Sequence, residues 1–357
     1  TGKGNLERSP SDPPTLSFMD ISSEPFERYS TVGRLRSEYQ YGRRYAAAIR
    51  ALRPTTVISS NAPLIAQRLA WRACARTGAS RFFWLQDFLG RGVRLVLSKR
   101  SALVGSTLGR AFESLETSLL RRSTGIIVIA DDFLDELAVR RVRVPALVVE
   151  NWAPLDEIRT GSKPNDWSTS MGLDGFRVAL YSGTLGLKHD PDHLVEVARR
   201  LDADNERLVV ISEGLGRDHL EKAKAAERLD AMVLTDFVPY SAFNDVLSTA
   251  DVCIVLLEDD AGTFSVPSKV LSYLAAGRAV VGAMPAANLA TRTIARAGAG
   301  IVVTPGSYEE FADGVVSLLR DPAATQRMGV DARQYAEQAF DASAIAGRVS
   351  DFVTRCS

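Results

Sequence analysis

The sequence predicts an α/β protein built from two doubly wound domains, each with a parallel sheet covered by helices. The chain has 357 residues, enough for two domains of ordinary size. Apolar segments of strand length alternate with helical patterns, which is typical of parallel sheets. We place the first domain at residues 1–155 and the second at 156–340, and we expect a C-terminal helix at 341–357 to pack on the first.

Charge and composition exclude several classes of protein. The 43 Lys and Arg residues balance 43 Asp and Glu residues, so the zero net charge does not indicate a nucleic-acid partner. No apolar run reaches the roughly 18 residues that predict a transmembrane helix. Cys74, Cys253 and Cys356 lie far apart without metal-ligand spacing, as expected of thiols in a reducing compartment. We therefore predict a cytoplasmic protein.

Five segments of the first half have strand character. They are 15–21, 55–60, 81–87, 125–130 and 146–151. Helical patterns separate several of them, at 32–52, about 62–76 and 131–139.

The stretch 91–122 is basic, with seven Lys or Arg residues against Glu113 and Glu116. Apolar side chains are interleaved with the basic ones. Such a segment suits a helix that lies on an anionic membrane surface. A core helix with a solvated basic face explains the pattern equally well, and both interpretations stay open.

The second half repeats a strand, a loop and a helix six times. It follows residues 151–154 and a polar stretch at 160–169, which we interpret together as an interdomain linker. The predicted strands are 178–182, 208–212, 232–236, 251–257, 279–283 and 300–304. We expect a ligand beyond the carboxyl ends of these strands, because open α/β sheets bind ligands there.

The loop and helix at 262–277 are the most informative part of the chain. Pro267 suits the first position of a helix, where a missing N–H costs nothing, and Gly277 suits its end. The free N–H groups near Ser268 and Lys269, the helix dipole and the lysine ammonium together predict a phosphate site. An ordinary strand–helix connection with a solvated lysine is the alternative.

Other loops of the second half carry groups that suit a nucleoside diphosphate. Gly183 and Gly186 permit close backbone approach, and Lys188 lies just before the next helix. The backbone of 237–239 could read the edge of a nucleobase. The sequence has neither the GxGxxG pattern of dinucleotide folds nor a GxxxxGK[ST] P-loop. The acidic loop 258–260 could bind sugar hydroxyls, or it could simply be solvated.

Four segments together resemble family 4 glycosyltransferases, in the branch of colanic-acid and O-antigen biosynthesis. They are Tyr181–Lys188 (YSGTLGLK), Glu213–Gly216 (EGLG), Pro267–Gly277 (PSKVLSYLAAG) and Trp84–Asp87 (WLQD). The resemblance implies a GT-B fold, in which two Rossmann-like domains face a cleft. It also implies a retaining transfer without metal or cofactor, from a nucleotide sugar held mostly by the second domain to a glycan or lipid-linked acceptor of cell-surface polysaccharide.

The sequence departs from this family at several positions. Ser272 and Phe264 stand where many relatives have two glutamates, and a hydroxyl holds a ribose more weakly than a carboxylate does. Thr184 replaces a common arginine. First domains of this family begin with an apolar strand and a glycine-rich loop, and this sequence has neither, so we expect the first domain to lack its N-terminal strand or strands. Either about 50 residues precede the sequence, judged from common element lengths, or the protein is naturally shortened. All three histidines lie in the second half, so the first domain has no counterpart to the histidine of many relatives.

We expect Lys188 and Lys269 to stabilise charge on the departing nucleoside diphosphate, and Asp87 to orient the sugar or the acceptor hydroxyl. Asp87 could instead be a helix cap or part of a turn at the end of a strand. The residues expected to bind the donor are Gly183, Thr184, Gly186, Glu213, Gly214, Phe237, Val238, Pro239, Val266, Pro267, Ser268 and Ser272. A catalytically silent glycosyltransferase-like subunit and a sugar-nucleotide epimerase are the alternatives. If 91–122 contacts lipid, the protein lies on the inner face of the plasma membrane.

Overall fold

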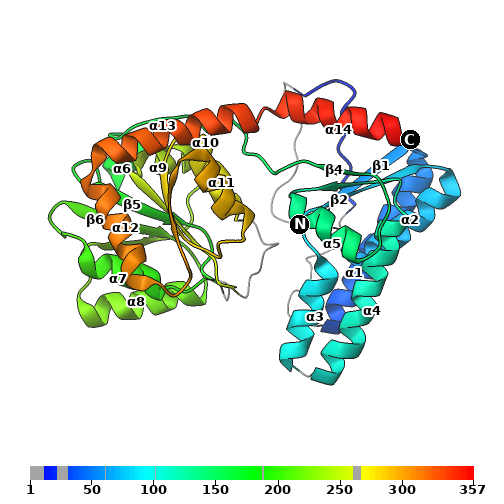
Figure 1. Cartoon of the computed structure of the whole chain (residues 1–357), viewed down its shortest axis with the longest axis horizontal. Coiled ribbons are helices and arrows are strands. Elements are labelled where there is room, and N and C mark those ends of the chain that lie inside the picture. The colour runs from blue at the N-terminus through cyan, green and yellow to red at the C-terminus, as the bar shows by residue number, and fades with distance from the viewer. Residues whose placement is uncertain (1–11, 22–30, 61, 101, 187–188, 260–266) are drawn as a thin grey trace. The chain divides into compact units, whose positions relative to one another are not determined.

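We analysed a computed structural model of the chain (Figure 1). It describes residues 12–21, 31–60, 62–100, 102–186, 189–259 and 267–357. The chain forms two compact units, and each contains one parallel sheet. Thr1–Glu150 and Gly347–Ser357 make the first unit, and Asn151–Ala346 make the second.

The first unit contains a four-stranded parallel sheet in the order β1-β2-β3-β4. Its strands are β1 (Thr56–Ser60), β2 (Ser80–Leu85), β3 (Gly125–Val128) and β4 (Ala146–Val148). The helices of this unit are α1 (Thr31–Leu52), α2 (Leu64–Thr77), α3 (Leu89–Arg100), α4 (Ala102–Arg121), α5 (Asp131–Val139) and most of α14 (Ala342–Cys356). Phe82 of β2 is fully buried, and its ring meets Phe352 of α14 edge-on at 5.8 Å between centroids. The C-terminal helix is therefore part of this core.

Two features of the first unit differ from what the sequence predicts. The strand expected at 15–21 is absent, since this described segment pairs with no sheet and leaves Phe18 and Met19 44% and 60% exposed. Alternating apolar residues make a strand only where a sheet edge accepts their backbone groups. The basic stretch 91–122 lies mainly in α3 and α4, which pack against each other as a helical hairpin (Figure 1).

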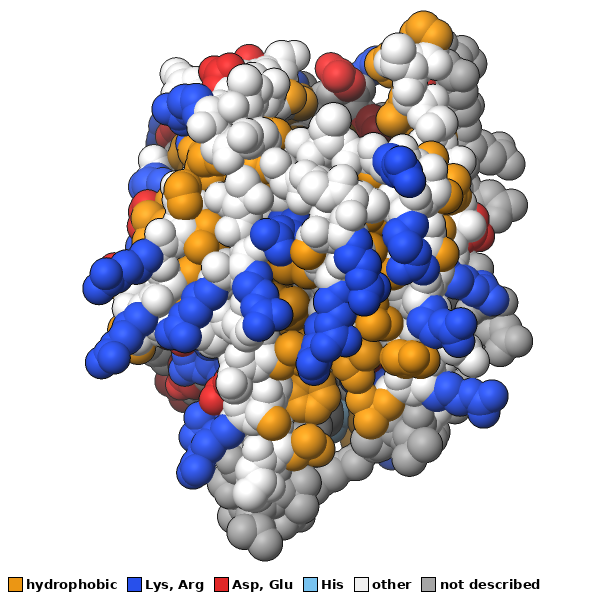
Figure 2. Space-filling view, turned by 90° about the vertical axis from the view of Figure 1, so that its right-hand side faces the viewer, with side chains coloured by type: hydrophobic (Ala, Val, Ile, Leu, Met, Phe, Trp, Pro, Cys, Tyr) orange, Lys and Arg blue, Asp and Glu red, His pale blue; other side chains and the backbone are white. Residues whose placement is uncertain are grey.

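Arginines are also concentrated on α1 and α2. Arg43, Arg50, Arg72 and Arg76 are exposed and line a shallow cavity between these helices. Figure 2 shows the face of the molecule where the helices of the first unit lie, with many basic side chains beside apolar ones. The balanced net charge of the whole chain thus conceals a strongly basic surface.

The second unit contains a six-stranded parallel sheet in the order β10-β9-β8-β5-β6-β7. The strands are β5 (Arg177–Ser182), β6 (Glu206–Ile211), β7 (Met232–Thr235), β8 (Val252–Leu256), β9 (Ala279–Ala283) and β10 (Gly300–Val303). All six predicted strands are therefore confirmed. The helices are α6 (Asp166–Ser170), α7 (Asp192–Arg200), α8 (Leu215–Glu227), α9 (Phe243–Thr249), α10 (Ser268–Ala275), α11 (Leu289–Ala297), α12 (Tyr308–Arg320) and α13 (Pro322–Ala339).

The sequence analysis interpreted the polar stretch 160–169 as a linker, but the structure shows that it is part of the second unit. Asn165 caps α6, since its side chain accepts a hydrogen bond from the N–H of Ser168. Trp167 then packs into the core and is 9% exposed, and Lys163 pairs with Asp251. A short capped helix with one buried indole is enough to fold a polar segment onto a domain.

The strand order of the second sheet reverses beside β5. From β5 the chain continues to β6 on one side, while β8 lies on the other, with Leu180 paired to Cys253. Loops that leave neighbouring strands here diverge to opposite faces of the sheet and open a crevice for a ligand. The described parts of the loops after β5 and β6 lie side by side at this point.

Candidate functional site

The loop after β5 brings its backbone close to the side chain of Lys269. Gly183 has φ +144°, a conformation that other residues rarely adopt. A Cβ atom at this position would lie 2.7 Å from Lys269 Nζ. A glycine is therefore required here both by the backbone conformation and by the space that the lysine occupies.

Backbone hydrogen bonds join the loop after β5 to the loop after β6. The N–H of Leu185 donates to the carbonyl of Glu213 at 3.2 Å, and the N–H of Gly216 donates to the carbonyl of Leu185 at 3.1 Å. Gly214 has φ +104° and begins α8. Five predicted residues lie in these two loops: Gly183, Thr184, Gly186, Glu213 and Gly214. The structure thus places them side by side at one edge of the sheet.

The amino end of α10 approaches the same edge. The helix begins at Ser268, one residue later than the sequence predicts, so Pro267 is the N-cap residue and not the first residue of the helix. Its Tyr273 hydroxyl lies 3.3 Å from the N–H of Ser182, at the end of β5. Lys269 and Tyr273 are four positions apart and so lie on one face of the helix. That face is fixed against β5, which directs Lys269 toward Gly183.

The ammonium group of Lys269 is buried and has no hydrogen-bond partner among the described residues. Its Nζ atom lies 3.8 Å from the centroid of the Tyr181 ring, so the aromatic face is its main electrostatic contact. Burial lowers the pKa of Lys269 from 10.5 to about 7. A buried ammonium is costly unless an anion is beside it, so this geometry suits a negatively charged ligand.

Other predicted donor-binding residues lie on the loop after β7 and on α10, and among the described residues no hydrogen bond joins their side chains to Lys269 or to the loops after β5 and β6. Phe237, after β7, is 46% exposed, whereas Val238 packs partly against the core. Ser272 is partly buried on α10, three positions from Lys269. Its hydroxyl is therefore on a neighbouring position of the helix surface.

Three predicted site residues, Lys188, Val266 and Asp87, are not part of this group. Lys188 and Val266 lie outside the described residues. So does Phe264, which was named above as a departure from the family. Asp87 belongs to the first unit, two residues beyond the end of β2, and not to the strand itself. Burial raises the pKa of Glu116, and the nearby Asp87 carboxylate adds to this rise.

One cluster of described residues has the donor atoms for a divalent cation. Ligand atoms of Asp190, His193 and Glu258 lie within 4.8 Å of one another. Asp190 already accepts a hydrogen bond from the Tyr308 hydroxyl at 2.5 Å. The expectation that the protein works without a metal remains a prediction.

Sequence reasoning did not identify the two tyrosines that shape this site. Tyr181 and Tyr273 are fully buried, and both lie against the loop after β5 or against Lys269. The spacing of Lys269 and Tyr273 was the available signal, because helical positions four apart share a face. Tyr181 looks in the sequence like any aromatic residue of a buried strand.

Comparison with known proteins finds glycosyltransferases. Residues 177–321 match the family described as Glycosyl transferases group 1. Among curated proteins, the chain is 28% identical over 169 residues to the putative colanic acid biosynthesis glycosyl transferase WcaI of Escherichia coli, covering 47% of this chain and 40% of that protein. It is 25% identical over 226 residues to the alpha-D-kanosaminyltransferase of Streptomyces kanamyceticus, covering 61% and 56%. The chain spans about half the length of these curated relatives.

Solved structures share the fold at low sequence identity. Sucrose-phosphate synthase of Thermosynechococcus elongatus superposes with a TM-score of 0.74 at 14% identity, covering 97% of this chain and 86% of that one. HepE of Anabaena, solved in complex with UDP, gives a TM-score of 0.70 at 13% identity, covering 88% and 82%. The chain therefore has the GT-B fold, and its residues 177–321 match the model of the group 1 glycosyl transferases.

Proposed function

We propose that this protein is a glycosyltransferase that takes its sugar from a nucleotide-diphosphate sugar. The buried, unpartnered ammonium of Lys269 beside Gly183 is the observation that carries the proposal. The family match supports it, because the match begins at β5 and includes both the Gly183 loop and α10. The structures of HepE in complex with UDP and with UDP-glucose support the choice of donor.

The chemistry follows from where negative charge develops. When the bond between the sugar and the diphosphate breaks, the leaving phosphate gains charge. A diphosphate beside Gly183 would receive the Lys269 ammonium on one side and the free N–H groups at the start of α10 on the other. Both are held in place before reaction, so they stabilise the leaving group without reorganisation.

Several finer features are part of the proposal. They are retention at the anomeric carbon, independence from metal, orientation of a sugar or acceptor hydroxyl by Asp87, and further charge from Lys188. The acceptor is a glycan or lipid-linked saccharide of the cell surface, and the likeness to WcaI supports this choice. Contact of 91–122 with the inner face of the plasma membrane completes it. No helix within the described segments is long and apolar enough to span a bilayer.

Binding and turnover of nucleotide sugars test the proposal. UDP-, GDP- and TDP-sugars are titrated into the full chain, and the thermal shift and the release of nucleoside diphosphate are measured. A ligand at about 100 times its dissociation constant raises the unfolding free energy by roughly 2.7 kcal/mol, which is readily seen. We expect one donor to bind and to be consumed when an acceptor is present. Failure of all three donors to bind would contradict the proposal.

Binding without turnover would instead favour the silent subunit. Interconversion of the free nucleotide sugar with its epimer would favour the epimerase. The stereochemistry of the product, read by NMR at the anomeric proton, separates retention from inversion.

A further inference from the structure

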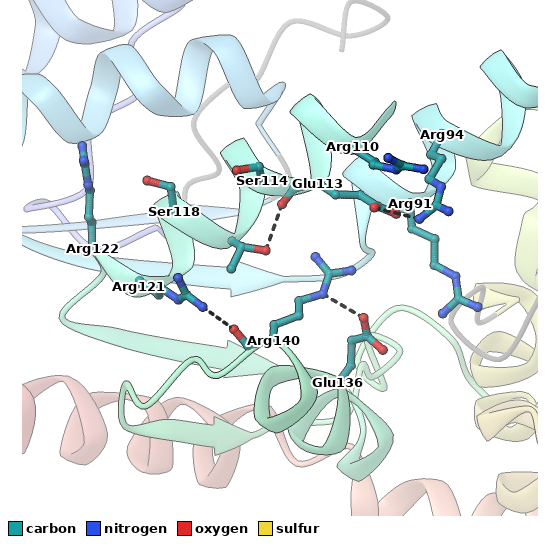
Figure 3. A pocket seen from close by; sticks show the side chains of 11 residues that line it. Arg91, Arg94, Arg110, Glu113, Ser114, Ser118, Arg121, Arg122, Glu136 and Arg140 are labelled. Carbon is teal, nitrogen blue, oxygen red and sulfur yellow. Dashed lines mark hydrogen bonds and ion pairs between the residues drawn. The ribbon is translucent and has the colours of Figure 1, made fainter. Parts of the chain in front are cut away.

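Besides the arginines of α1 and α2, the first unit has a second group of arginines, on and after α3, α4 and α5. Helices α3, α4 and α5, with the residues that follow them, enclose a cavity of about 1020 Å³ (Figure 3). Its arginines are Arg91, Arg94, Arg110, Arg121, Arg122 and Arg140. Glu113 and Glu136 also line it, so the lining carries an excess of positive charge.

Only part of this charge is neutralised inside the protein. Arg94 pairs with Glu113 at 3.0 Å, and Arg140 pairs with Glu136 at 2.8 Å. Arg110 and Arg122 are exposed, and the side chain of neither makes an ion pair or hydrogen bond with a described residue. Unpaired guanidinium groups that face a cavity favour an anionic ligand.

Arg121 also lacks a carboxylate partner among the described residues. It donates instead to the backbone carbonyl of Arg140 at 2.7 Å, which leaves its charge uncompensated. Together with Arg110 and Arg122, it gives the cavity at least three positive charges that no described carboxylate balances.

The free charges of the cavity lie far apart along α4. Arg110 is near the beginning of the lining part of α4 and Arg122 follows the end of the helix, so twelve residues of helix, about 18 Å, separate them. Figure 3 shows Arg110 beside Arg94 at one end and Arg122 at the other. Ser114 and Ser118 lie between them on the same stretch of α4. Hydroxyl groups thus occupy the space between two charged ends.

The floor of the cavity is rigid. The Arg140 side chain is only 11% exposed and bonds Glu116, which is fully buried, at 2.8 Å. Its guanidinium also lies 4.4 Å from the centroid of the Phe88 ring. The N–H of Gly90, at the start of α3, donates to Glu116 as well. This network joins all three helices and holds the cavity open before a ligand arrives.

We propose that this cavity binds an acidic oligosaccharide, with its oxyanion groups at the two arginine ends and its sugar hydroxyls on the serines between. Guanidinium groups match carboxylate and phosphate oxygens as bidentate pairs. A single compact anion would satisfy one end and leave the other unpaired. A neutral glycan would leave both ends unpaired. If the chain is a glycosyltransferase as proposed above, this oligosaccharide is its acceptor.

Direct binding of a defined probe tests this proposal without any turnover. Fluorescently labelled hexagalacturonate is titrated into the full chain, and maltohexaose serves as the neutral probe of the same length. The test variant is Arg110→Gln with Arg122→Gln. The matched control is Arg43→Gln with Arg72→Gln, which removes two equally exposed arginines from α1 and α2.

We expect hexagalacturonate to bind, maltohexaose not to bind, and the test variant to weaken binding at least tenfold. The control variant should bind like the original protein. Equal loss in both double variants, or equal binding of the two saccharides, would overturn the proposal. So would no binding of hexagalacturonate at all.

Two further measurements separate other anions from the oligosaccharide. Inorganic pyrophosphate is titrated into the Lys269→Met variant, which lacks the predicted donor cation, and vesicles containing phosphatidylglycerol are floated with the protein. Pyrophosphate that binds this cavity as tightly as the saccharide would overturn the proposal. So would vesicle capture that is lost without Arg110 and Arg122 while saccharide binding is kept. UDP binding by the Arg110→Gln, Arg122→Gln variant should be unchanged. Failure of the donor site would therefore appear in UDP binding, and failure of the cavity in saccharide binding.

Discussion

The two cationic regions of this protein differ in how water reaches them. The second unit has one lysine whose ammonium is buried and unpartnered, whereas the first unit has a cavity with several exposed arginines. Burial disfavours the charged form of a lysine and so lowers its pKa, which makes its charge depend on pH near neutrality. A charge that stays in water keeps its proton but is screened by salt. The same sign of charge should therefore produce a pH-dependent site in one unit and a salt-dependent site in the other.

The largest predicted effect is on stability, and it concerns the ion pair of Glu116 and Arg140. This pair differs from the exposed arginines of the same cavity because it is mostly buried. Glu116 is fully buried and holds Arg140, so Glu116→Ala leaves a nearly buried guanidinium with one partner fewer. We expect the free energy of unfolding to fall by about 3 kcal/mol. Urea denaturation followed by circular dichroism measures this.

Glu113→Ala is the matched control, since Glu113 pairs with the more exposed Arg94. It should cost less than about 1 kcal/mol. Equal losses in the two variants would show that the floor of the cavity is not a buried ion pair.

Lys269→Met should weaken binding of the nucleoside diphosphate by about 30- to 100-fold, since a charge-assisted hydrogen bond contributes roughly 2–3 kcal/mol. Calorimetric titration of UDP checks this. Lys222→Met, on the exposed surface of α8, should bind UDP normally. An undiminished affinity in Lys269→Met would remove Lys269 from the donor site.

Donor affinity should fall as the pH rises above 7. The free protein holds the proton of Lys269 only up to about pH 7, whereas the diphosphate binds the protonated form. Each further pH unit should therefore cost up to about tenfold in affinity. Titrations of UDP between pH 7 and 9 should show this decline in the original protein and not in Lys269→Met. Parallel curves would contradict the assignment.

Stability should change with pH in the opposite direction. The pKa of Lys269 is about 7 in the folded protein and about 10.4 in an unfolded chain. Between these values the unfolded state binds more protons, so the free energy of unfolding rises with pH. Thermal denaturation from pH 7 to 9 should show this rise, and Lys269→Met should reduce its slope.

The smallest predicted effect is that of salt on binding affinity, and it should differ between the arginine cavity and the donor site. Raising the ionic strength from about 0.05 M to about 0.5 M should weaken hexagalacturonate binding several-fold, because exposed charges are screened. UDP binding should change less, since the Lys269 ammonium is buried. Fluorescence and calorimetric titrations at both salt concentrations make the comparison. The reverse order would contradict the distinction between the two regions.

The sequence was sufficient to predict the second unit and much of its site. Six strand–loop–helix repeats, Pro267 before α10 and the glycine loops are local signals, and the sheet topology then brings their ends together. The buried state of Lys269 was not predictable, because it depends on Tyr181 and on how α10 lies against β5. Helical spacing alone does not show which face of a helix is covered.

The first unit was harder to predict for two physical reasons. The segment 15–21 alternates like a strand, but pairing is decided by distant parts of the chain. The basic stretch 91–122 was recognised, yet its arginines form a cavity only together with Glu136 of α5 and Arg140, which directly follows that helix. Such a cavity arises from the packing of three helices, which the pattern of one helix does not show.

Proton uptake on donor binding is the most direct test of the buried lysine. UDP is titrated calorimetrically at pH 8 in buffers of different ionisation enthalpy, and the number of protons taken up is derived from the slope of the observed heat. With a pKa of about 7, Lys269 is mostly neutral in the free protein at this pH and must gain a proton when the diphosphate binds. The original protein should take up close to one proton and Lys269→Met almost none. Equal uptake by the two proteins would contradict the account.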